Sequence, residues 1–269
     1  MCSCLLLAHP FLEMGFLDDW SYIKTAQVFA HTGRPVYNGW ATATLGWQVL
    51  WGALFSRLFG FSFAHVRLST LPVAMASVYL FHQILIRFGI SRGSAIFGSL
   101  SLALSPTFFA MSATYMTDVP GVFCTLLCLY FCQRAISLTA DRAALAWLCL
   151  AAVTNVSGGT VRQTAWLGAL VILPSAVWLL RRRPAVLWGG TLLWVISAGA
   201  YSLLCIGSIN SPISFPHASP FTSFFRQRSH ARFYERPLTP SWRFSPHCCC
   251  CFPYSSRGGQ VRALRQSAA

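Results

Sequence analysis

Residues 66–88 read VRLSTLPVAMASVYLFHQILIRF, and this stretch decides the class of protein. It runs for 23 residues without an acidic side chain, and its two arginines lie near its ends. A helix needs about 20 mostly apolar residues to cross the roughly 30 Å hydrocarbon core of a bilayer. The stretch is therefore long enough to cross with some tilt, and it predicts a membrane-spanning helix.

Five more apolar runs follow the first one, and the turns between them carry charges of different kinds. Every second turn holds arginines, which are typical of cytoplasmic loops. The other turns hold Asp118 and Arg162, so we expect these two residues on the opposite face of the membrane. The apolar runs are residues 94–111, 119–135, 143–156, 165–180 and 185–206, and the arginines are Arg87, Arg92, Arg134, Arg142 and Arg181–Arg183.

The composition agrees with a membrane protein. The 269 residues are 55% hydrophobic and only 10% charged, against about 25% charged in soluble domains. An ordinary soluble enzyme is therefore excluded. The formal net charge of +14 could indicate a nucleic-acid partner. However, the arginines before residue 211 lie between apolar runs, so we expect a membrane and no nucleic acid.

The sequence divides into four parts and predicts an all-α, polytopic membrane protein. About six full transmembrane helices and additional interfacial helices are expected. The last part, residues 211–269, is rich in Pro, Ser and Arg, and we interpret it as disordered or as the product of a shifted reading frame. The parts are the remnant of a first membrane helix (1–17), an extracytoplasmic loop with juxtamembrane helices (18–65), the transmembrane bundle (66–210) and the basic tail (211–269).

Residues 47–59 determine which acidic residues share a face of the membrane. If this segment crosses, Asp18 and Asp19 lie opposite Asp118; if it lies along the surface, all three share one face. Charge counting favours a crossing, because it divides the basic residues 9 to 3 instead of 7 to 5. Its 13 residues are short for a span, and length therefore favours the surface.

The chain has only six acidic residues, so each one at a membrane edge is a functional candidate. Asp18 and Asp19 follow an apolar stretch, and Asp118 precedes a predicted helix that has Pro120 in its first turn. Capping of the following helix is the alternative role for these carboxylates. As functional groups, one carboxylate could accept a proton from a hydroxyl, and another could orient the acceptor or hold a divalent metal. Nearby cations that could bind a phosphate are Lys24, Arg67 and Arg162.

The cysteines predict packing and no metal site. Cys124, Cys128 and Cys132 follow at intervals of four residues, which places them on one face of a helix. Small polarizable side chains of this kind pack well between helices. The run of four cysteines at 248–251 lacks the spacing of a metal-binding turn, and no site is assigned to it.

Three stretches resemble the opening third of the GT-C superfamily of membrane glycosyltransferases. They are FLDDWSYIKTAQVFAHTGRPVYNGW, LFSRLFGFSFAHVRLSTLP and LSPTFFAMSATYMTDVPG, in this order. The groups they resemble are the dolichyl-phosphate-mannose–protein mannosyltransferase-like and lipid A aminoarabinose transferase-like proteins. The matching positions are the acidic pair Asp18-Asp19, then Phe59-Gly60 and Arg67-Leu68, then Asp118 after Ser105-Pro106.

This resemblance implies a polyprenyl-phosphate-linked sugar donor, an extracytoplasmic site and inversion at the sugar. It implies that Asp18 is the general base and that residues 47–59 lie along the membrane surface. Asp19 would support Asp18, and Asp118 would be a second carboxylate, with Asp18 and Asp118 as candidate ligands of a divalent metal. The substrate-binding candidates are Lys24, Tyr37, Arg67, Arg162 and Gln163.

The sequence thus predicts a multi-pass glycosyltransferase of a bacterial inner membrane. It would transfer a sugar from a polyprenyl phosphate to a lipid, glycan or protein acceptor. One alternative is a small transporter or flippase, but transporters place ionisable groups near the bilayer midplane, and here they lie at membrane edges. Another alternative is an inactive fragment, since the later helices of the family are absent and the tail matches nothing in it.

Overall fold

A computed structural model describes residues 13–15, 18–34, 36 and 45–210, with side chains up to residue 203. Within these ranges all regular structure is helical, as the sequence predicts. The first four helices are α2 (Asp19–Thr32), α3 (Gly46–Phe59), α4 (Phe63–Leu68) and α5 (Thr70–Arg87). The next four are α6 (Arg92–Leu104), α7 (Pro106–Ser112), α8 (Asp118–Ser137) and α9 (Asp141–Gly159). A 3₁₀ turn, η1 (Gln163–Trp166), and a π-helical turn, η2 (Gly168–Ile172), lead into α10 (Leu173–Leu179) and α11 (Pro184–Asn210).

Fewer full spans are found than the six that the sequence predicts. Three helices are long and apolar enough to cross a membrane: Phe63–Arg87, which joins α4 to α5, α8, and α11 over Pro184–Leu203. The pair α6 and α7 counts as a fourth span only if a bend of 63° between them is accepted. The helix α9 falls outside this set, and Gln163–Leu179 is a shorter apolar helix. The prediction of six full spans is therefore not confirmed.

Polar and helix-breaking residues explain the difference. Residues 94–111 were expected as one span, but Pro106 has no backbone N–H and forces the preceding Ser105 into an extended conformation with ψ of 126°. The chain therefore bends between α6 and α7. In α9, Asp141 and Arg142 at one end and Asn155 near the other lower the hydropathy. The run 165–180 is divided among 3₁₀, π and α turns.

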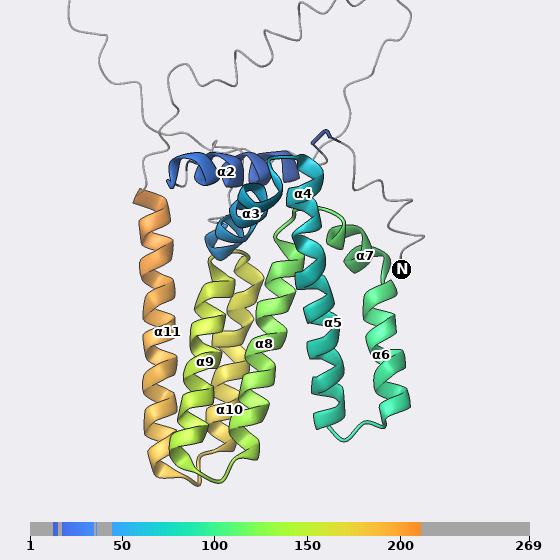
Figure 1. Cartoon of the computed structure of the whole chain (residues 1–269). Coiled ribbons are helices and arrows are strands. Elements are labelled where there is room, and N and C mark those ends of the chain that lie inside the picture. The colour runs from blue at the N-terminus through green and yellow to red at the C-terminus, as the bar shows by residue number, and fades with distance from the viewer. Residues whose placement is uncertain (1–12, 16–17, 35, 37–44, 211–269) are drawn as a thin grey trace, which may run out of the picture. The chain divides into compact units, whose positions relative to one another are not determined.

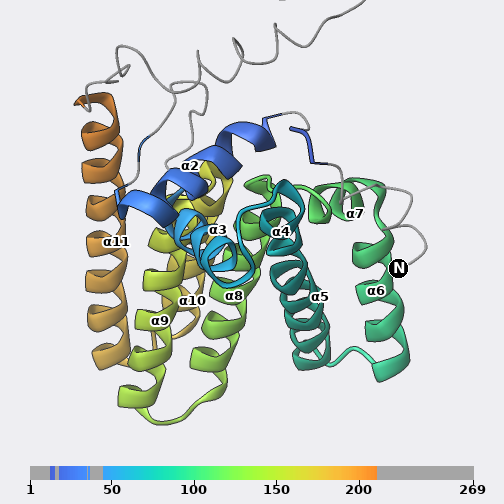
Figure 2. The same cartoon turned by 45° about the horizontal axis from the view of Figure 1, so that its top comes forward.

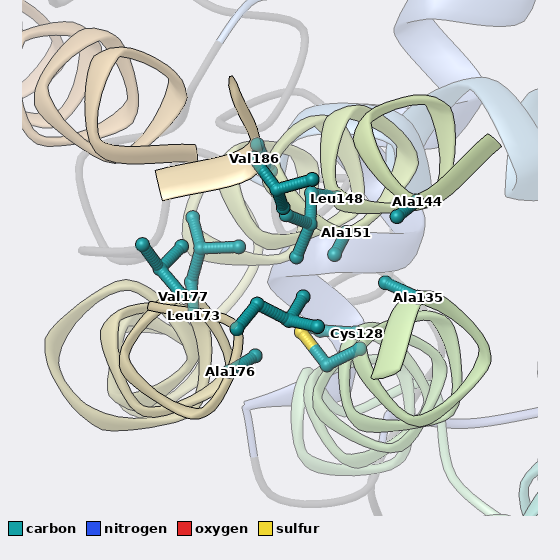
Figure 3. Close-up of a cluster of buried hydrophobic side chains, with 12 residues drawn as sticks. Cys128, Ala135, Ala144, Leu148, Ala151, Leu173, Ala176, Val177 and Val186 are labelled. Atoms are coloured by element: carbon teal, nitrogen blue, oxygen red, sulfur yellow. The ribbon is translucent and has the colours of Figure 1, made fainter. Parts of the chain in front are cut away.

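Small side chains form the core between α8, α9, α10 and the beginning of α11 (Figure 3). Cys124, Cys128 and Cys132 are 3%, 0% and 2% exposed, so the predicted cysteine face packs against neighbouring helices. Ala144, Leu148 and Ala151 of α9 belong to the same buried cluster as Cys128 and Cys132. Small residues let membrane helices approach closely, which is the main source of packing energy between them.

Helix α3 lies at the same end of the bundle as α2, α4 and α7 (Figures 1 and 2). The contacts of α3 agree with this position. Gln48 donates a hydrogen bond to the turn before α8. Trp51 donates one to the Ser69 carbonyl before α5, and Arg57 donates one to the Ala30 carbonyl of α2. This helix covers residues 47–59, which length and the family resemblance place along the surface. It does not cross the bundle.

The acidic residues at 18, 19 and 118 consequently share one end of the bundle, which we call the acidic end. The turns that carry the arginines lie at the opposite end, which we call the arginine end. They are the turn between α5 and α6, the turn between α8 and α9, and the turn between α10 and α11. The same-face arrangement expected from the sequence is found, and the side of the membrane remains a prediction from the arginines.

Candidate active site

The two acidic residues before α2 have different surroundings. Asp18 is exposed, whereas Asp19, the first residue of α2, has 0% exposure. Asp18 occupies the N-cap position of α2, but its side chain makes no capping hydrogen bond. The capping role that we weighed for this carboxylate is therefore not what the structure shows. Asp18 presents its carboxylate at the surface of the acidic end.

Asp19 forms a buried ion pair with Arg67 of α4. The Arg67 Nε atom lies 2.7 Å from Asp19 Oδ2, and Nη2 lies 3.2 Å from Oδ1, so the guanidinium holds both carboxylate oxygens. The same Nη2 donates a hydrogen bond of 2.5 Å to the carbonyl of Met14. Arg67 is 3% exposed. Its donors thus hold the segment before α2 against α4, and the phosphate contact expected of Arg67 from the sequence stays a prediction.

Glu13 holds the same segment from a second point, and sequence reasoning missed it. Its carboxylate accepts hydrogen bonds from the Ser62 hydroxyl and, at 3.0 Å, from the backbone N–H of Phe63 at the beginning of α4. Burial raises the pKa of Glu13, but these hydrogen bonds together lower it by more than burial raises it. The pKa of Glu13 therefore lies below its usual value. A carboxylate at a helix N-terminus is also stabilised by the free backbone N–H groups there.

Asp118 and Arg162 form a second ion pair at the acidic end. Arg162 Nη2 lies 2.8 Å from Asp118 Oδ1, and Nη1 donates a hydrogen bond of 3.1 Å to the Thr117 hydroxyl. Asp118 is the first residue of α8, and a Cβ atom at Gly121 one turn later would lie 2.8 Å from Arg162 Cβ. The glycine therefore makes room for the arginine. The side chains of Arg162 and Asp118 are 40% and 34% exposed, so this pair remains open to a ligand.

The charges of this pair and of Asp18 all act on the pKa of Tyr22. Its side chain is 7% exposed and lies on α2, one helical turn after Asp18. Burial raises the pKa of Tyr22, the charges of Asp18 and Asp118 raise it further, and the charge of Arg162 lowers it. Tyr22 is therefore within electrostatic reach of all three charged groups. Sequence reasoning missed it, although a tyrosine four residues after Asp18 faces the same side of a helix.

Of the remaining candidates, Lys24 and Gln163 lie within the described residues. Lys24 Nζ donates a hydrogen bond of 2.9 Å to Gln27 and lies 4.9 Å from the ring centre of Phe61. Burial lowers the pKa of Lys24. Gln163 is exposed and follows Arg162 directly. Tyr37 lies outside the described residues.

The expected metal site was tested against the donor groups that are present. In the described ranges, no group of three or more His, Cys, Asp or Glu side chains lies close enough together to hold a metal ion. Asp118 is already paired with Arg162. Asp18 and Asp118 therefore do not belong to a three-ligand metal site in the described part of the chain.

Comparison with solved structures identifies the fold. The chain superposes on ArnT from Cupriavidus metallidurans in the apo state with a TM-score of 0.58, at 15% identity over 81% of this chain and 43% of ArnT. It superposes on the same protein bound to undecaprenyl phosphate with a TM-score of 0.57, at 18% identity over 85% of this chain and 42% of ArnT. This chain has the fold of ArnT. The fold agrees with the GT-C resemblance predicted from the sequence.

The likeness to ArnT is one of fold and covers part of that protein. This chain spans less than half of the ArnT chain's length. The sequence matches no family model and no curated protein. The ArnT fold and the apolar helices together show a helical membrane protein.

Proposed function

We propose that this chain acts as a membrane glycosyltransferase that uses a polyprenyl-phosphate-linked sugar. The observation that carries the proposal is the half-exposed Asp118–Arg162 ion pair, which lies at the same end of an ArnT-like bundle as the exposed Asp18. ArnT itself was crystallised with undecaprenyl phosphate. The acceptor would be a hydroxyl group of a lipid, glycan or protein.

Asp18 is the proposed general base, because its carboxylate is exposed at the acidic end and it is the first acid of the pair that matches the GT-C resemblance. It would accept the proton of the acceptor hydroxyl while the acceptor oxygen bonds to the anomeric carbon. The bond between that carbon and the phosphate oxygen would break, and its electron pair would leave with the polyprenyl phosphate. Attack opposite the leaving group inverts the sugar. The proton then passes from Asp18 to water.

Arg162 is the proposed phosphate contact, with Asp118 as its positioning partner. A guanidinium can bind a carboxylate on one side and still offer N–H donors to a phosphate. The 40% exposure of Arg162 leaves such donors accessible. Lys24 is a second cation on the same element as Asp18 and Tyr22. Arg67 is not used, because its donors are held by Asp19 and Met14.

The proposed location is a bacterial inner membrane, with the acidic end outside the cytoplasm. Arginines in the turns of the arginine end favour the cytoplasm for that end. The transporter alternative receives less support, because the ion pairs of the described residues lie at the two ends of the bundle rather than at its middle.

The experiment measures transfer from a radiolabelled polyprenyl-phosphate sugar by the full chain in lipid vesicles. We expect transfer by the unmodified chain, and a decrease of about 10²–10⁴-fold in Asp18→Asn, because asparagine keeps the size of the side chain but cannot accept the proton. Asp141→Asn, at the arginine end, is the matched control and should retain full activity. No transfer from any sugar of a hexose and pentose panel would refute the proposal. Near-normal transfer by Asp18→Asn would mean that another residue is the general base.

A further inference from the structure

We propose that α3 positions the Asp118–Arg162 ion pair, and that Gln48 and Tyr115 are the residues through which it does so. This inference rests on the proposed function, because it assigns a task to the pair. Helix α3 contacts two segments, one directly before Asp118 and one directly before Arg162.

Gln48 and Tyr115 hold each other reciprocally. The Gln48 side-chain amide Nε2 lies 3.4 Å from the Tyr115 carbonyl and 3.3 Å from the Met116 carbonyl. The Tyr115 hydroxyl donates a hydrogen bond back to the Gln48 backbone carbonyl. Both residues are 1% exposed. Because water does not compete for these groups, the contacts fix the turn before α8 against α3.

The orientation of the Gln48 amide follows from its neighbours. Two backbone carbonyls can accept hydrogen bonds but cannot donate them, so the NH₂ group must face them. The Gln48 oxygen, Oε1, is buried without a hydrogen-bond partner among the described residues. Leaving a buried acceptor unpaired costs free energy. A leucine at this position would avoid this cost, but it would leave the Tyr115 and Met116 carbonyls without the Gln48 amide donor.

Gly52 makes room for this arrangement. A Cβ atom at position 52 would overlap the Tyr115 hydroxyl. Glycine weakens a helix by about 1 kcal/mol relative to alanine, and α3 nevertheless carries it where the tyrosine enters. The close approach of Tyr115 to the α3 backbone therefore depends on this residue.

The fixed turn leads directly to the ion pair. Tyr115 and Met116 are followed by Thr117, whose hydroxyl accepts a hydrogen bond of 3.1 Å from Arg162 Nη1. The next residue is Asp118, whose carboxylate binds Arg162 Nη2. A shift of residues 115–116 would thus move both groups that hold the guanidinium.

The N-terminus of α3 contacts the segment that carries Arg162. Gly46, with a φ of +28°, packs so closely on Thr160 that a Cβ atom there would overlap its side chain. Thr160 is fixed by a hydrogen bond of 2.6 Å to the Ser157 carbonyl and precedes Arg162 by two residues. One helix therefore contacts both the segment that leads to Asp118 and the segment that leads to Arg162. We infer that α3 sets the separation between these two residues.

The test compares Tyr115→Phe, which removes one hydroxyl, and Gln48→Leu, which keeps the volume and removes the amide. Tyr79→Phe on α5, where the side chain is 63% exposed, is the control. In the transfer assay we expect kcat to fall about tenfold in Tyr115→Phe, roughly the effect of one lost hydrogen bond. The KM for the donor should rise as well, because Arg162 is the proposed phosphate contact. The control should match the unmodified chain.

A double variant separates positioning from a general loss of structure. If Tyr115 acts through the ion pair, Tyr115→Phe should cause no further loss of kcat in an Asp118→Asn background. Losses that multiply in the double variant would overturn the inference.

Hydrogen exchange measures the same geometry without activity. Amides of residues 115–121 and 160–163 should exchange about tenfold faster in Tyr115→Phe and Gln48→Leu, and unchanged exchange would overturn the inference. Absence of transfer by the unmodified chain would instead refute the proposed function, and the exchange rates would still decide whether α3 holds these two segments.

Discussion

Two aspartate–arginine pairs lie at the acidic end, and they differ in exposure. In the pair Asp19–Arg67 the side chains are 0% and 3% exposed, and in the pair Asp118–Arg162 they are 34% and 40% exposed. The donor–acceptor distances are nearly equal, at 2.7 and 2.8 Å. The two pairs therefore have the same charged groups at nearly the same distance, and they differ in their exposure to solvent.

The environment decides what each pair can do. A buried guanidinium with both carboxylate oxygens and a backbone carbonyl as partners has no surface for a ligand, and removing one partner leaves a charge without compensation. A half-exposed pair is screened by water and contributes little to stability. Its donors, however, are accessible to a substrate. We therefore assign the buried pair to folding and the half-exposed pair to function.

The largest expected effect is a loss of stability when the buried pair is broken. Asp19→Asn should lower the free energy of unfolding by about 3–5 kcal/mol, because it leaves Arg67 charged and buried. Thermal unfolding of the purified chain in detergent measures this. The matched change at the exposed pair of the arginine end, Asp141→Asn, should cost less than about 1 kcal/mol, since Asp141 is 46% exposed.

A double replacement tests whether the loss comes from the unpaired charge. Asp19→Leu combined with Arg67→Met removes both charges and should recover most of the stability that Asp19→Asn loses. If Asp19→Asn unfolds at the same temperature as the unmodified chain, the distinction between the two pairs is wrong.

The next effect concerns ligand affinity at the half-exposed pair. Arg162→Gln should weaken binding of undecaprenyl phosphate about tenfold or more, because a charge-assisted hydrogen bond to phosphate contributes about 1.5–3 kcal/mol. The unfolding temperature should change little. Native mass spectrometry of the full chain with the lipid measures the affinity. Arg57→Gln is the control, since Arg57 bonds to the Ala30 carbonyl on the same end of the bundle.

Two outcomes would contradict this assignment. If Arg162→Gln binds the lipid normally but unfolds early, the half-exposed pair is structural after all. If Arg57→Gln weakens binding as much as Arg162→Gln does, the effect is one of overall charge at this end rather than of a specific contact.

Most of the helical layout was predictable from the sequence, because long apolar runs separated by charged turns have few alternatives in a membrane. The bend at Ser105–Pro106 was also present in the sequence, and the prediction of one span over residues 94–111 overlooked it. The π-helical turn that begins at Gly168 was not predictable. A Cβ atom at Gly168 would overlap the Asn155 side chain, and this contact between distant residues exists only in the packed bundle.

The candidate site was predictable in part. The sequence placed Asp18, Asp118 and Arg162 on one face, and the structure has them at one end of the bundle, where their charges act on the pKa of Tyr22. The partner of Asp19 was not foreseen, although Asp19, Ile23 and Ala26 have the spacing of one buried helix face and all three are buried. An acidic residue on such a face requires a cation. Glu13 gave no signal, since its contact with Ser62 spans 49 residues.

The smallest expected effect comes from Glu13, a carboxylate that is held by a hydroxyl and backbone N–H groups. Its pKa in the folded chain lies below its ordinary value of 4.5, so the folded state binds the proton less well than the unfolded state. Its contribution to stability is therefore complete above about pH 4.5 and is lost as the pH falls through the lowered pKa. Because Glu13 is exposed, we expect only about 0.5 kcal/mol from this contact. Glu13→Gln should unfold slightly earlier than the unmodified chain at pH 7, and the difference should shrink as the pH falls through the lowered pKa. A difference that persists at low pH would mean that the side chain acts through packing and not through its charge.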